Sequence, residues 1–284
     1  MSELYSPSPV SKKLFNVGMS AIAFTLAALA IVPLLAMLWA IFSKGLPHLT
    51  WNVFTQLPAP AGMKDVPSGF ANAIQGTVLM VAIASGISLP LGLLTAIFLN
   101  EFGKTSAIAN GVRFLITILS AAPSIIVGVF AYGVIVLPLH GFSALAGGFA
   151  LSVIMLPIVS LATEESLKLV PNAQRLASAA LGAGVSRTTI RVVLAKALPG
   201  ILTSVLLAIA RAAGETAPLI FTALFSQDWL QSITGPSASL SVLIFNYANS
   251  PFVDQNNLAW ASAVILVGMV LTTNLLSRYV TRKR

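Results

Sequence analysis

Charge-free, mostly apolar stretches alternate with short polar segments along the 284-residue chain. A membrane-spanning helix needs about 20 consecutive apolar residues. Four charge-free stretches exceed the length of one span: residues 14–43, 66–100, 114–163 and 255–277. The stretch 114–163 is long enough for two helices, and the turn-forming run 138–141 divides it.

A further apolar segment runs from Pro199 to Phe225 and is interrupted only by Arg211 and Glu215. The pattern as a whole predicts an all-α membrane protein with six transmembrane helices. The first apolar run is too long for a signal-peptide core and no small-residue cleavage site follows it, so we expect it to be retained. The predicted helices cover about residues 15–43, 69–99, 113–137, 143–163, 199–226 and 257–278.

Composition supports the membrane assignment and excludes other classes. Hydrophobic residues make up 57% of the chain and charged residues 8%, with a mean hydropathy of +0.91. Soluble domains are about 25% charged, so a soluble enzyme and a disordered scaffold are both excluded. The chain has no Cys, which excludes disulfides, thiolate metal sites and Cys nucleophiles.

The distribution of basic residues predicts the orientation of the chain. If the N-terminus is cytoplasmic, the outer segments 44–68 and 227–256 hold only Lys44 and Lys64 of the 16 Lys and Arg residues. All the others except Arg211 then lie at the cytoplasmic side, as the positive-inside rule requires. Both termini are therefore predicted to be cytoplasmic, and the net charge of +8 indicates topology rather than nucleic-acid binding.

The sequence contains only incomplete matches to nucleotide-binding and metal-binding motifs. The run Gly103-Lys104-Thr105 imitates the end of a phosphate-binding loop, but Phe98 stands where the motif needs Gly. His48 and His140 are far apart and have no clustered carboxylates around them, so we expect outer-loop residues rather than metal ligands. We predict no catalytic residue, no metal site and no cofactor in this chain.

Two charged residues in the fifth apolar segment are candidates for function. Counting 1.5 Å for each residue from Pro199, Arg211 lies about 18 Å into the span. Arg211 and Glu215 are spaced i, i+4, so they lie on one helix face within reach of each other. Charges at this depth cost at least a few kcal/mol and suggest function by default. The pair is either a structural ion pair between helices or a guanidinium that meets a permeating anion.

The largest cytoplasmic segment, 164–198, also has a distinctive pattern. Pro171-Asn172 is a helix-start signal, a short helix over 176–181 ends at the Gly182-Ala183-Gly184 turn, and Ser186 is placed to cap a second helix, 187–198. Two short helices around a Gly turn would form a compact projection from the membrane. This projection is either a loop without partners or a docking site for a soluble protein.

The cytoplasmic segment resembles a known family. The runs 175–183, 192–194 and 198–200 are similar to the "EAA" loop of ABC importer permeases. The resemblance implies a coupling helix that docks on an ATPase subunit. The sequence departs from the family pattern at Leu176, where Glu is usual, and at Leu161, where Arg is frequent. The coupling residues that the resemblance implies are Leu176, Ala177, Ser178, Gly182, Ala183 and Gly184.

The run 208–219 is similar to phosphate permeases of this family, of the PstA type, as are the runs 120–128, 242–247 and 258–261. This resemblance covers residues 67–284 and implies a type I ABC importer permease in a bacterial inner membrane. It implies a substrate pathway lined by Arg211, Glu215 and Thr216. The implied partners are phosphate, membrane lipid, a second homologous permease chain, two ATPase subunits that hold ATP and magnesium, and an external phosphate-binding protein.

We therefore expect half of the translocation pathway of an ATP-driven phosphate importer. Residues 1–66 are expected to form an N-terminal tail, the first helix and an outer segment, and residues 67–284 the transmembrane domain with its coupling loop. Two alternatives remain open. One is a permease for another oxyanion such as sulfate or molybdate, and the other is a membrane enzyme that acts on phosphate esters.

Overall fold

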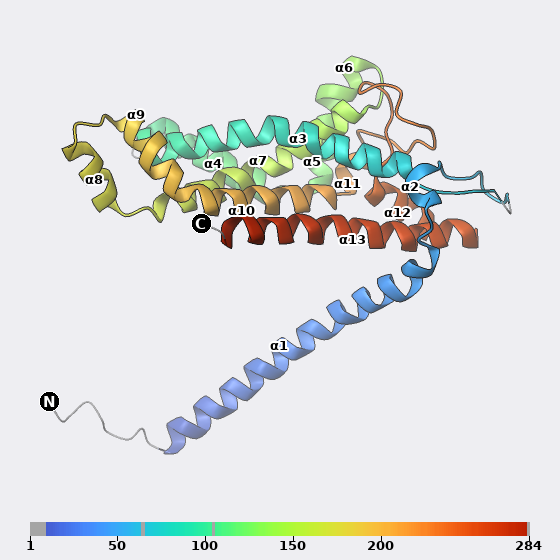
Figure 1. Ribbon diagram of the computed structural model, residues 1–284, viewed down its shortest axis with the longest axis horizontal. Helices are drawn as coiled ribbons and strands as arrows, with labels where there is room; N and C mark the ends of the chain where they lie inside the picture. The colour runs from blue at the N-terminus through green and yellow to red at the C-terminus, as the bar shows by residue number, and fades with distance from the viewer. Residues whose placement is uncertain (1–9, 64–65, 104–105, 283–284) are drawn as a thin grey trace.

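The computed structural model describes residues 10–63, 66–103 and 106–282, and every regular element in these ranges is a helix. Five helices are long and apolar enough to cross a membrane, and a bent pair of helices brings the number to six if it is one span. The prediction of an all-α membrane fold is confirmed. Most of the long helices run roughly alongside one another, and the first diverges from them (Figure 1).

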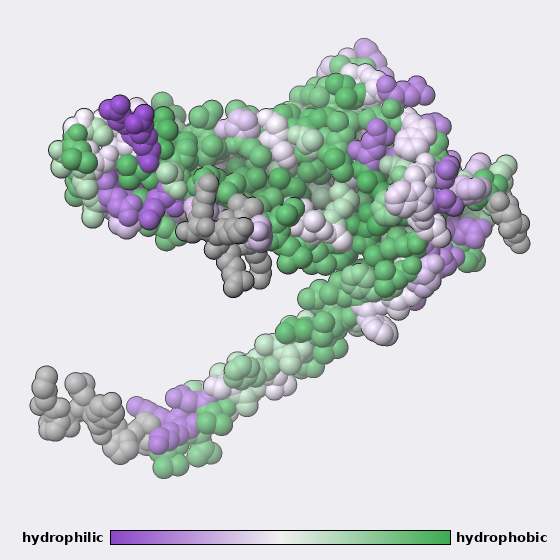
Figure 2. All heavy atoms as spheres, viewed as in Figure 1, coloured by the Kyte–Doolittle hydropathy of each residue, from purple (hydrophilic) through white to green (hydrophobic). Residues whose placement is uncertain are grey.

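The first helix, α1 (Val10–Gly45), meets the others only near its last turn. Apolar residues cover its length and nearly all of its side chains are exposed (Figure 2). A Cβ added at Gly45 would lie 2.4 Å from the carbonyl oxygen of Trp260, so only glycine permits this close approach to the last helix. Two short helical turns follow, η1 (Leu46–His48) and α2 (Asn52–Thr55).

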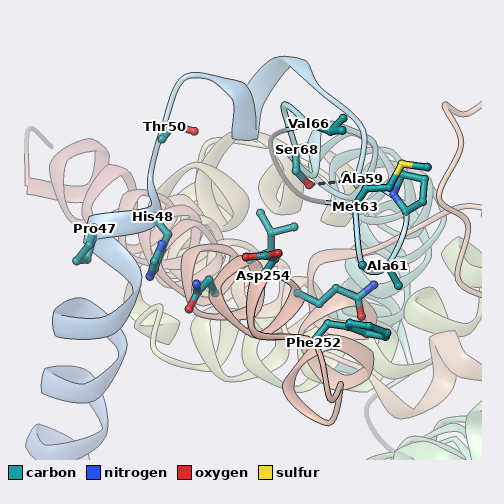
Figure 3. A pocket seen from close by; sticks show the side chains of 15 residues that line it. Pro47, His48, Thr50, Ala59, Ala61, Met63, Val66, Ser68, Phe252 and Asp254 are labelled. Carbon is teal, nitrogen blue, oxygen red and sulfur yellow. Dashed lines mark hydrogen bonds between the residues drawn. The ribbon is translucent and has the colours of Figure 1, made fainter.

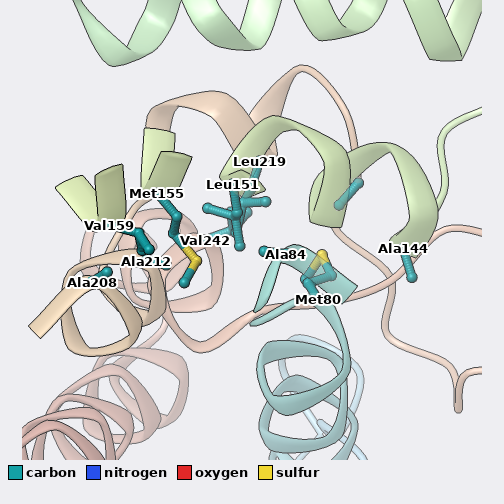
Figure 4. Packing of buried hydrophobic residues seen from close by; sticks show 11 residues of the cluster. Met80, Ala84, Ala144, Leu151, Met155, Val159, Ala208, Ala212, Leu219 and Val242 are labelled. Carbon is teal, nitrogen blue, oxygen red and sulfur yellow. The ribbon is translucent and has the colours of Figure 1, made fainter. Parts of the chain in front are cut away.

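The centre of the molecule consists of long helices packed side by side. The helices α3 (Ala71–Ile97) and α7 (Ala144–Lys168) share the largest contact, and α10 (Leu194–Ala213) packs against α7. The last helix, α13 (Val253–Arg282), lies against α10. The main apolar cluster lies between α3, α7 and α10 (Figure 4), and its buried members include Met80, Leu151, Met155, Val159 and Ala208.

Small residues bring α3 and α7 together. A Cβ at Gly148 would lie 2.5 Å from the side chain of Ile83, and one at Gly92 would lie 2.8 Å from that of Val159. In a membrane, helices associate through close packing because lipid tails are as apolar as the side chains. The glycines on both helices therefore make this contact tight along its length.

The predicted helix 113–137 is wrong as a single helix. It forms α4 (Ala107–Ala121) and α5 (Ser124–Ala131), which are bent by 106° at Ala122-Pro123. Pro123 has no N–H to donate, and it favours an extended backbone at Ala122, whose ψ is 132°. The chain then continues through a π-helical turn, η3 (Tyr132–Val136), and α6 (Leu137–Leu139).

The predicted helix 199–226 is also interrupted. The helix α10 ends at Ala213, and a four-residue helix, α11 (Ala217–Ile220), follows the break. A further helix, α12 (Leu240–Ala248), lies inside segment 227–256, for which we expected only an outer loop. Its start is capped by Ser239, whose hydroxyl accepts the N–H of Val242.

The cytoplasmic segment has the predicted helix pair with different boundaries. It comprises α8 (Asn172–Ala180), α9 (Val185–Thr188) and a π-helical turn, η4 (Thr189–Val193), which continues directly into α10. Gly182 has φ of +79°, a conformation that glycine adopts without steric cost, which confirms the predicted turn. Ser186 is not a cap, because Gly184 holds the N-cap position and Ser186 lies inside α9.

The start of α1 and the end of α13 both lie toward the side of the molecule that carries α8 and α9 (Figure 1). An even number of membrane crossings places both ends of a chain on the same side in this way. The cytoplasmic location of that side remains a prediction from the charge distribution. A third π-helical turn, η2 (Phe98–Phe102), follows α3 on the same side.

Candidate functional site

Arg211 and Glu215 lie at the point where α10 breaks. The Nε atom of Arg211 is 3.4 Å from Oε1 of Glu215, so the predicted i, i+4 ion pair is present. The two side chains differ in accessibility: 59% of the Arg211 side chain is exposed but only 15% of the Glu215 side chain. The guanidinium is therefore open on one side while its carboxylate partner is largely covered.

Neighbouring elements hold the segment after the break. Gly214 occupies the C-cap of α10, and the carbonyl oxygen of Glu215 accepts a hydrogen bond of 2.8 Å from the hydroxyl of Ser241 on α12. Thr216 is the N-cap residue of α11, and its carbonyl oxygen accepts the N–H groups of Leu219 and Ile220. These bonds satisfy backbone groups that a helix break would otherwise leave unpaired in the bundle.

A close contact brings the α4–α5 bend beside the α10 break. A Cβ at Gly128 of α5 would lie 2.7 Å from Cα of Pro218 of α11, so the two backbones touch there. Both helices also pack against α7. The two interruptions of the membrane helices therefore meet in space, although about ninety residues separate them in the chain.

Arg211 lines a small pocket of about 80 Å³ between these interruptions. Ser120 and Ser124, one on each side of Pro123, line the same pocket, and neither serine hydroxyl has a hydrogen-bond partner among the described residues. The apolar part of the lining includes Val127, Ile154, Pro157 and Ile158. A guanidinium and two hydroxyls provide several donors for one oxyanion in an otherwise apolar setting.

Sequence reasoning did not identify the two serines as pathway residues. The run 120–128 contributed only to the family resemblance, and Ser120 and Ser124 were not distinguished within it. The available signal was Pro123, since a proline in a long apolar run can break a helix and direct nearby side chains to a new face. The structure brings Arg211 and the two serines together in the pocket lining. Glu215 contacts Arg211 but does not line the pocket, and neither does Thr216.

The predicted coupling residues lie at the end of the molecule far from this pocket (Figure 1). No residue of α8 is buried, and its apolar side chains are open: Leu176 is 70% exposed, and Leu181 after the helix is 90% exposed. The hydroxyls of Ser178 and Thr188 are 2.9 Å apart and join α8 to α9. Ala177, Gly182 and Gly184 are exposed, and Ala183 is half-buried at the turn.

A shallow pocket of about 270 Å³ lies beside α8 and α9, with Leu176, Ala179, Ala183 and Val185 in its lining. Exposed apolar groups gathered at one end of a molecule indicate an interaction surface. The geometry therefore agrees with a docking site at the coupling loop better than with a loop that has no partner.

Another pocket, of about 450 Å³, lies at the opposite end of the molecule (Figure 3). It is formed by the outer segment 44–68 and the start of α13, and it contains none of the predicted pathway residues. His48 and Asp254 both belong to it. No group of three potential metal ligands occurs among the residues the structure describes.

Comparisons with known proteins agree with this architecture. Residues 88–284 match the family described as binding-protein-dependent transport system inner membrane component. The fold resembles that of a bacterial ABC transporter for import of the acidic polysaccharide alginate, with a TM-score of 0.61, 12% identity and coverage of 96% of this chain and 99% of that chain. It also resembles the inward-facing MetNI methionine ABC transporter, with a TM-score of 0.58, 19% identity and coverage of 74% and 95%. Fold and family define a permease subunit of a type I ABC importer.

Relatives with higher sequence identity identify the type of permease within this class. The chain is 42% identical over 251 residues to the phosphate transport system permease protein PstA of Yersinia pestis, covering 87% of this chain and 84% of that protein. It is 41% identical over 268 residues to PstA of Haemophilus influenzae, covering 94% of each. The chain therefore belongs to the PstA type of binding-protein-dependent permease. It is a multi-pass inner-membrane protein and a transporter subunit rather than an enzyme.

Proposed function

We propose that this chain forms half of the translocation pathway of an ATP-driven importer of inorganic phosphate. The observation that carries the proposal is the open guanidinium of Arg211 at a helix break, beside the hydroxyls of Ser120 and Ser124. The relatives named as phosphate transport permeases support phosphate as the anion. Arg211, Glu215 and Thr216 are proposed as pathway residues, with the two serines as additional contacts.

Arg211 can exchange one partner for another. Its ion-pair contact with Glu215 is long, with Nε 3.4 Å from Oε1, and more than half of the Arg211 side chain is exposed, so its guanidinium can also bind an oxyanion in the pocket. In the absence of the anion, Glu215 keeps the site close to neutral, which lowers the cost of the charge in the membrane. When phosphate enters, Glu215 opposes tight binding, so the anion leaves again quickly enough for transport.

The other oxyanions remain the nearest alternative. Sulfate and molybdate would also bind a guanidinium, so the pocket alone does not select against them. The PstA-type relatives favour phosphate. Uptake of labelled phosphate into right-side-out vesicles that contain the whole complex, with unlabelled sulfate or molybdate as competitor, separates the candidates. A ten-fold excess of either competitor should leave phosphate uptake unchanged.

The coupling loop is proposed to dock on an ATPase subunit. The exposed Leu176 and Leu181 fit an apolar groove, and Leu176 would replace the usual Glu contact by an apolar one. We further propose two ATPase subunits that hold ATP and magnesium, a second permease chain and an external phosphate-binding protein. In this assembly residues 67–284 form the transmembrane domain, and 1–66 add the first helix and an outer segment.

Crosslinking tests the docking. The native chain has no Cys, so a single Cys at Ala183 or Leu181 has no background. Each should crosslink to the ATPase subunit, while a Cys at His140, the C-cap residue of α6 near the opposite end of the molecule, should not. If the His140 position crosslinks and the other two do not, the coupling loop is not the docking site.

The orientation has its own test. A reporter fused after Ser237 should behave as external, and reporters fused after Arg187 and at the C-terminus should behave as internal. These outcomes follow from the distribution of Lys and Arg residues. An external C-terminus would contradict the orientation and, with it, the cytoplasmic position of α8.

A further inference from the structure

Arg175 on the coupling helix makes a dense set of polar contacts with the membrane helices. Its Nη2 atom lies 2.8 Å from Oε1 of Glu101, and its Nε atom 3.4 Å from Oε2, so two nitrogen atoms of the guanidinium pair with both carboxylate oxygens. Nη2 also donates to the carbonyl oxygen of Leu167 at 3.0 Å, and Nη1 donates to that of Val170. One side chain thus joins α8 to the end of α3 and to the end of α7.

The ion pair is shielded from water. The side chains of Arg175 and Glu101 are 16% and 6% exposed, which makes them much less accessible than most charged groups at this end of the molecule. Charge-assisted and paired hydrogen bonds of this kind are both strong and geometrically specific. The amide of Asn100 also donates to Glu101, at 2.7 Å, and restrains the carboxylate.

The rest of α8 is weakly attached. None of its residues is buried, so burial of apolar side chains does not hold it against the bundle. Its other side-chain link, from Ser178 to Thr188, leads to α9. A displacement of α8 can therefore reach α10 through the continuous helix that starts at Val185, and α7 through the short link 169–171. It reaches the end of α3, which is distant in the chain, through the pair of Arg175 with Glu101.

We propose that the Arg175–Glu101 ion pair is the connection through which movement of the coupling helix reaches α3, so that α3 and α7, which pack closely together, shift as one unit. Arg175 and Glu101 are positioning residues: they touch no substrate and act by transmitting displacement. The helix α7 carries Ile154, Pro157 and Ile158 of the Arg211 pocket, so a shift of its end is passed to the pocket lining. This inference rests on the proposed function, because it requires an ATPase that moves α8.

A second ion pair at the same end provides a matched control. Arg113 on α4 pairs with Glu164 on α7 at 3.1 Å, and Arg113 donates to the carbonyl oxygen of Leu99. Glu164 is as well buried as Glu101, with 3% of its side chain exposed. This pair joins α4 to α7 and does not involve α8, so its loss should not disconnect the coupling helix.

The experiment measures phosphate imported for each ATP hydrolysed by the purified whole complex in proteoliposomes. Glu101→Gln removes the ion pair and leaves the bonds from Arg175 to the two carbonyls possible. We expect the complex to assemble and to hydrolyse ATP within about two-fold of wild type, while phosphate per ATP falls at least about five-fold. Glu101→Asp, which keeps the charge, should retain most of the ratio, and Glu164→Gln should leave the ratio within about two-fold of wild type.

A covalent link adds an independent measurement. In the Cys-free chain, Glu101→Cys with Arg175→Cys should be uncoupled, and a short bis-maleimide that bridges the two positions should restore the ratio. An unchanged ratio in Glu101→Gln would overturn the proposal, and so would full coupling of the double Cys variant before bridging. Loss of assembly in both Glu101→Gln and Glu101→Asp would also overturn it by assigning the pair to stability alone. Failure of the wild-type complex to import phosphate would instead refute the proposed function.

Discussion

Two arginine–glutamate pairs in this chain have opposite designs. Arg211 meets Glu215 through one contact of 3.4 Å and leaves 59% of its side chain open. Arg175 meets Glu101 through its Nε and Nη2 atoms, donates to two carbonyl oxygens as well, and its side chain is 16% exposed. Arg211 therefore keeps hydrogen-bond donors that can bind an anion, whereas the donors of Arg175 are taken up by groups of the protein.

The difference separates a binding role from a transmitting one. A residue that binds a passing anion needs unsatisfied donors and a competing partner of moderate strength. A residue that transmits movement needs several short bonds that do not exchange. The same pair of residue types can therefore serve either role, and the number of remaining donors on the arginine distinguishes the two.

The largest effect is expected for Arg211→Gln. Charge-assisted hydrogen bonds contribute about 1.5–3 kcal/mol each, so the loss of two should reduce phosphate uptake about 100-fold or more. Uptake into vesicles measures it. Because Glu215 is then left unpaired, which can cost about 3–5 kcal/mol, the amount of assembled complex has to be measured in parallel.

The double variant Arg211→Gln with Glu215→Gln resolves this ambiguity. It is neutral and similar in volume, so assembly should recover. If Arg211 serves the anion, uptake stays low. Near-normal uptake by the double variant would mean that the pair only joins structural elements, and the contrast between the two arginines would disappear.

Arg211→Lys should have the next largest effect. Lysine keeps the charge but lacks the planar fork, so we expect uptake to fall about 20-fold with assembly unchanged. The corresponding variant of the saturated pair, Arg175→Lys, should lower phosphate per ATP rather than ATP-independent anion binding. If Arg211→Lys and Arg175→Lys changed phosphate per ATP and ATP-independent anion binding to the same extent, the assignment of a binding role to Arg211 and a transmitting role to Arg175 would be wrong.

Gly182→Val tests the coupling end alone. Gly182 has φ of +79°, which costs a residue with a Cβ about 1–2 kcal/mol, and a β-branched residue more. No atom lies within 4 Å of the added Cβ, so the effect is conformational rather than steric. We expect about ten-fold less ATP-driven uptake with membrane insertion intact. Gly111→Val on α4, which also meets no atom within 4 Å of its added Cβ, is the control, and an equal loss there would argue against a role for the turn.

The smallest effects are expected for Ser120→Ala and Ser124→Ala. Each removes one hydroxyl from the Arg211 pocket, and a hydrogen bond contributes about 1 kcal/mol, so uptake should fall about five-fold in each. Thr117→Ala on the same helix is the control, because the hydroxyl of Thr117 bonds to the carbonyl of Arg113 in its own helix. If all three variants behave alike, the serines have no special relation to the anion.

The amino-acid sequence alone determined the membrane class and the approximate positions of the spans. Apolar length and charge spacing are local properties, so residues 15–43 and 69–99 were predicted close to α1 and α3. The spacing of Arg211 and Glu215 and the turn at Gly182 were likewise local, and both are present. Each of these features depends on residues only a few positions apart.

Tertiary structure alone decided where helices break and which distant side chains meet. Pro33, Pro90, Pro157 and Pro199 all lie inside helices, so a proline does not by itself predict the bend at Pro123. The bend accompanies the contact of Gly128 with Pro218, ninety residues away, and Arg175 finds Glu101 across 74 residues. Because such contacts form between helices whose apolar faces look alike in sequence, only packing selects them.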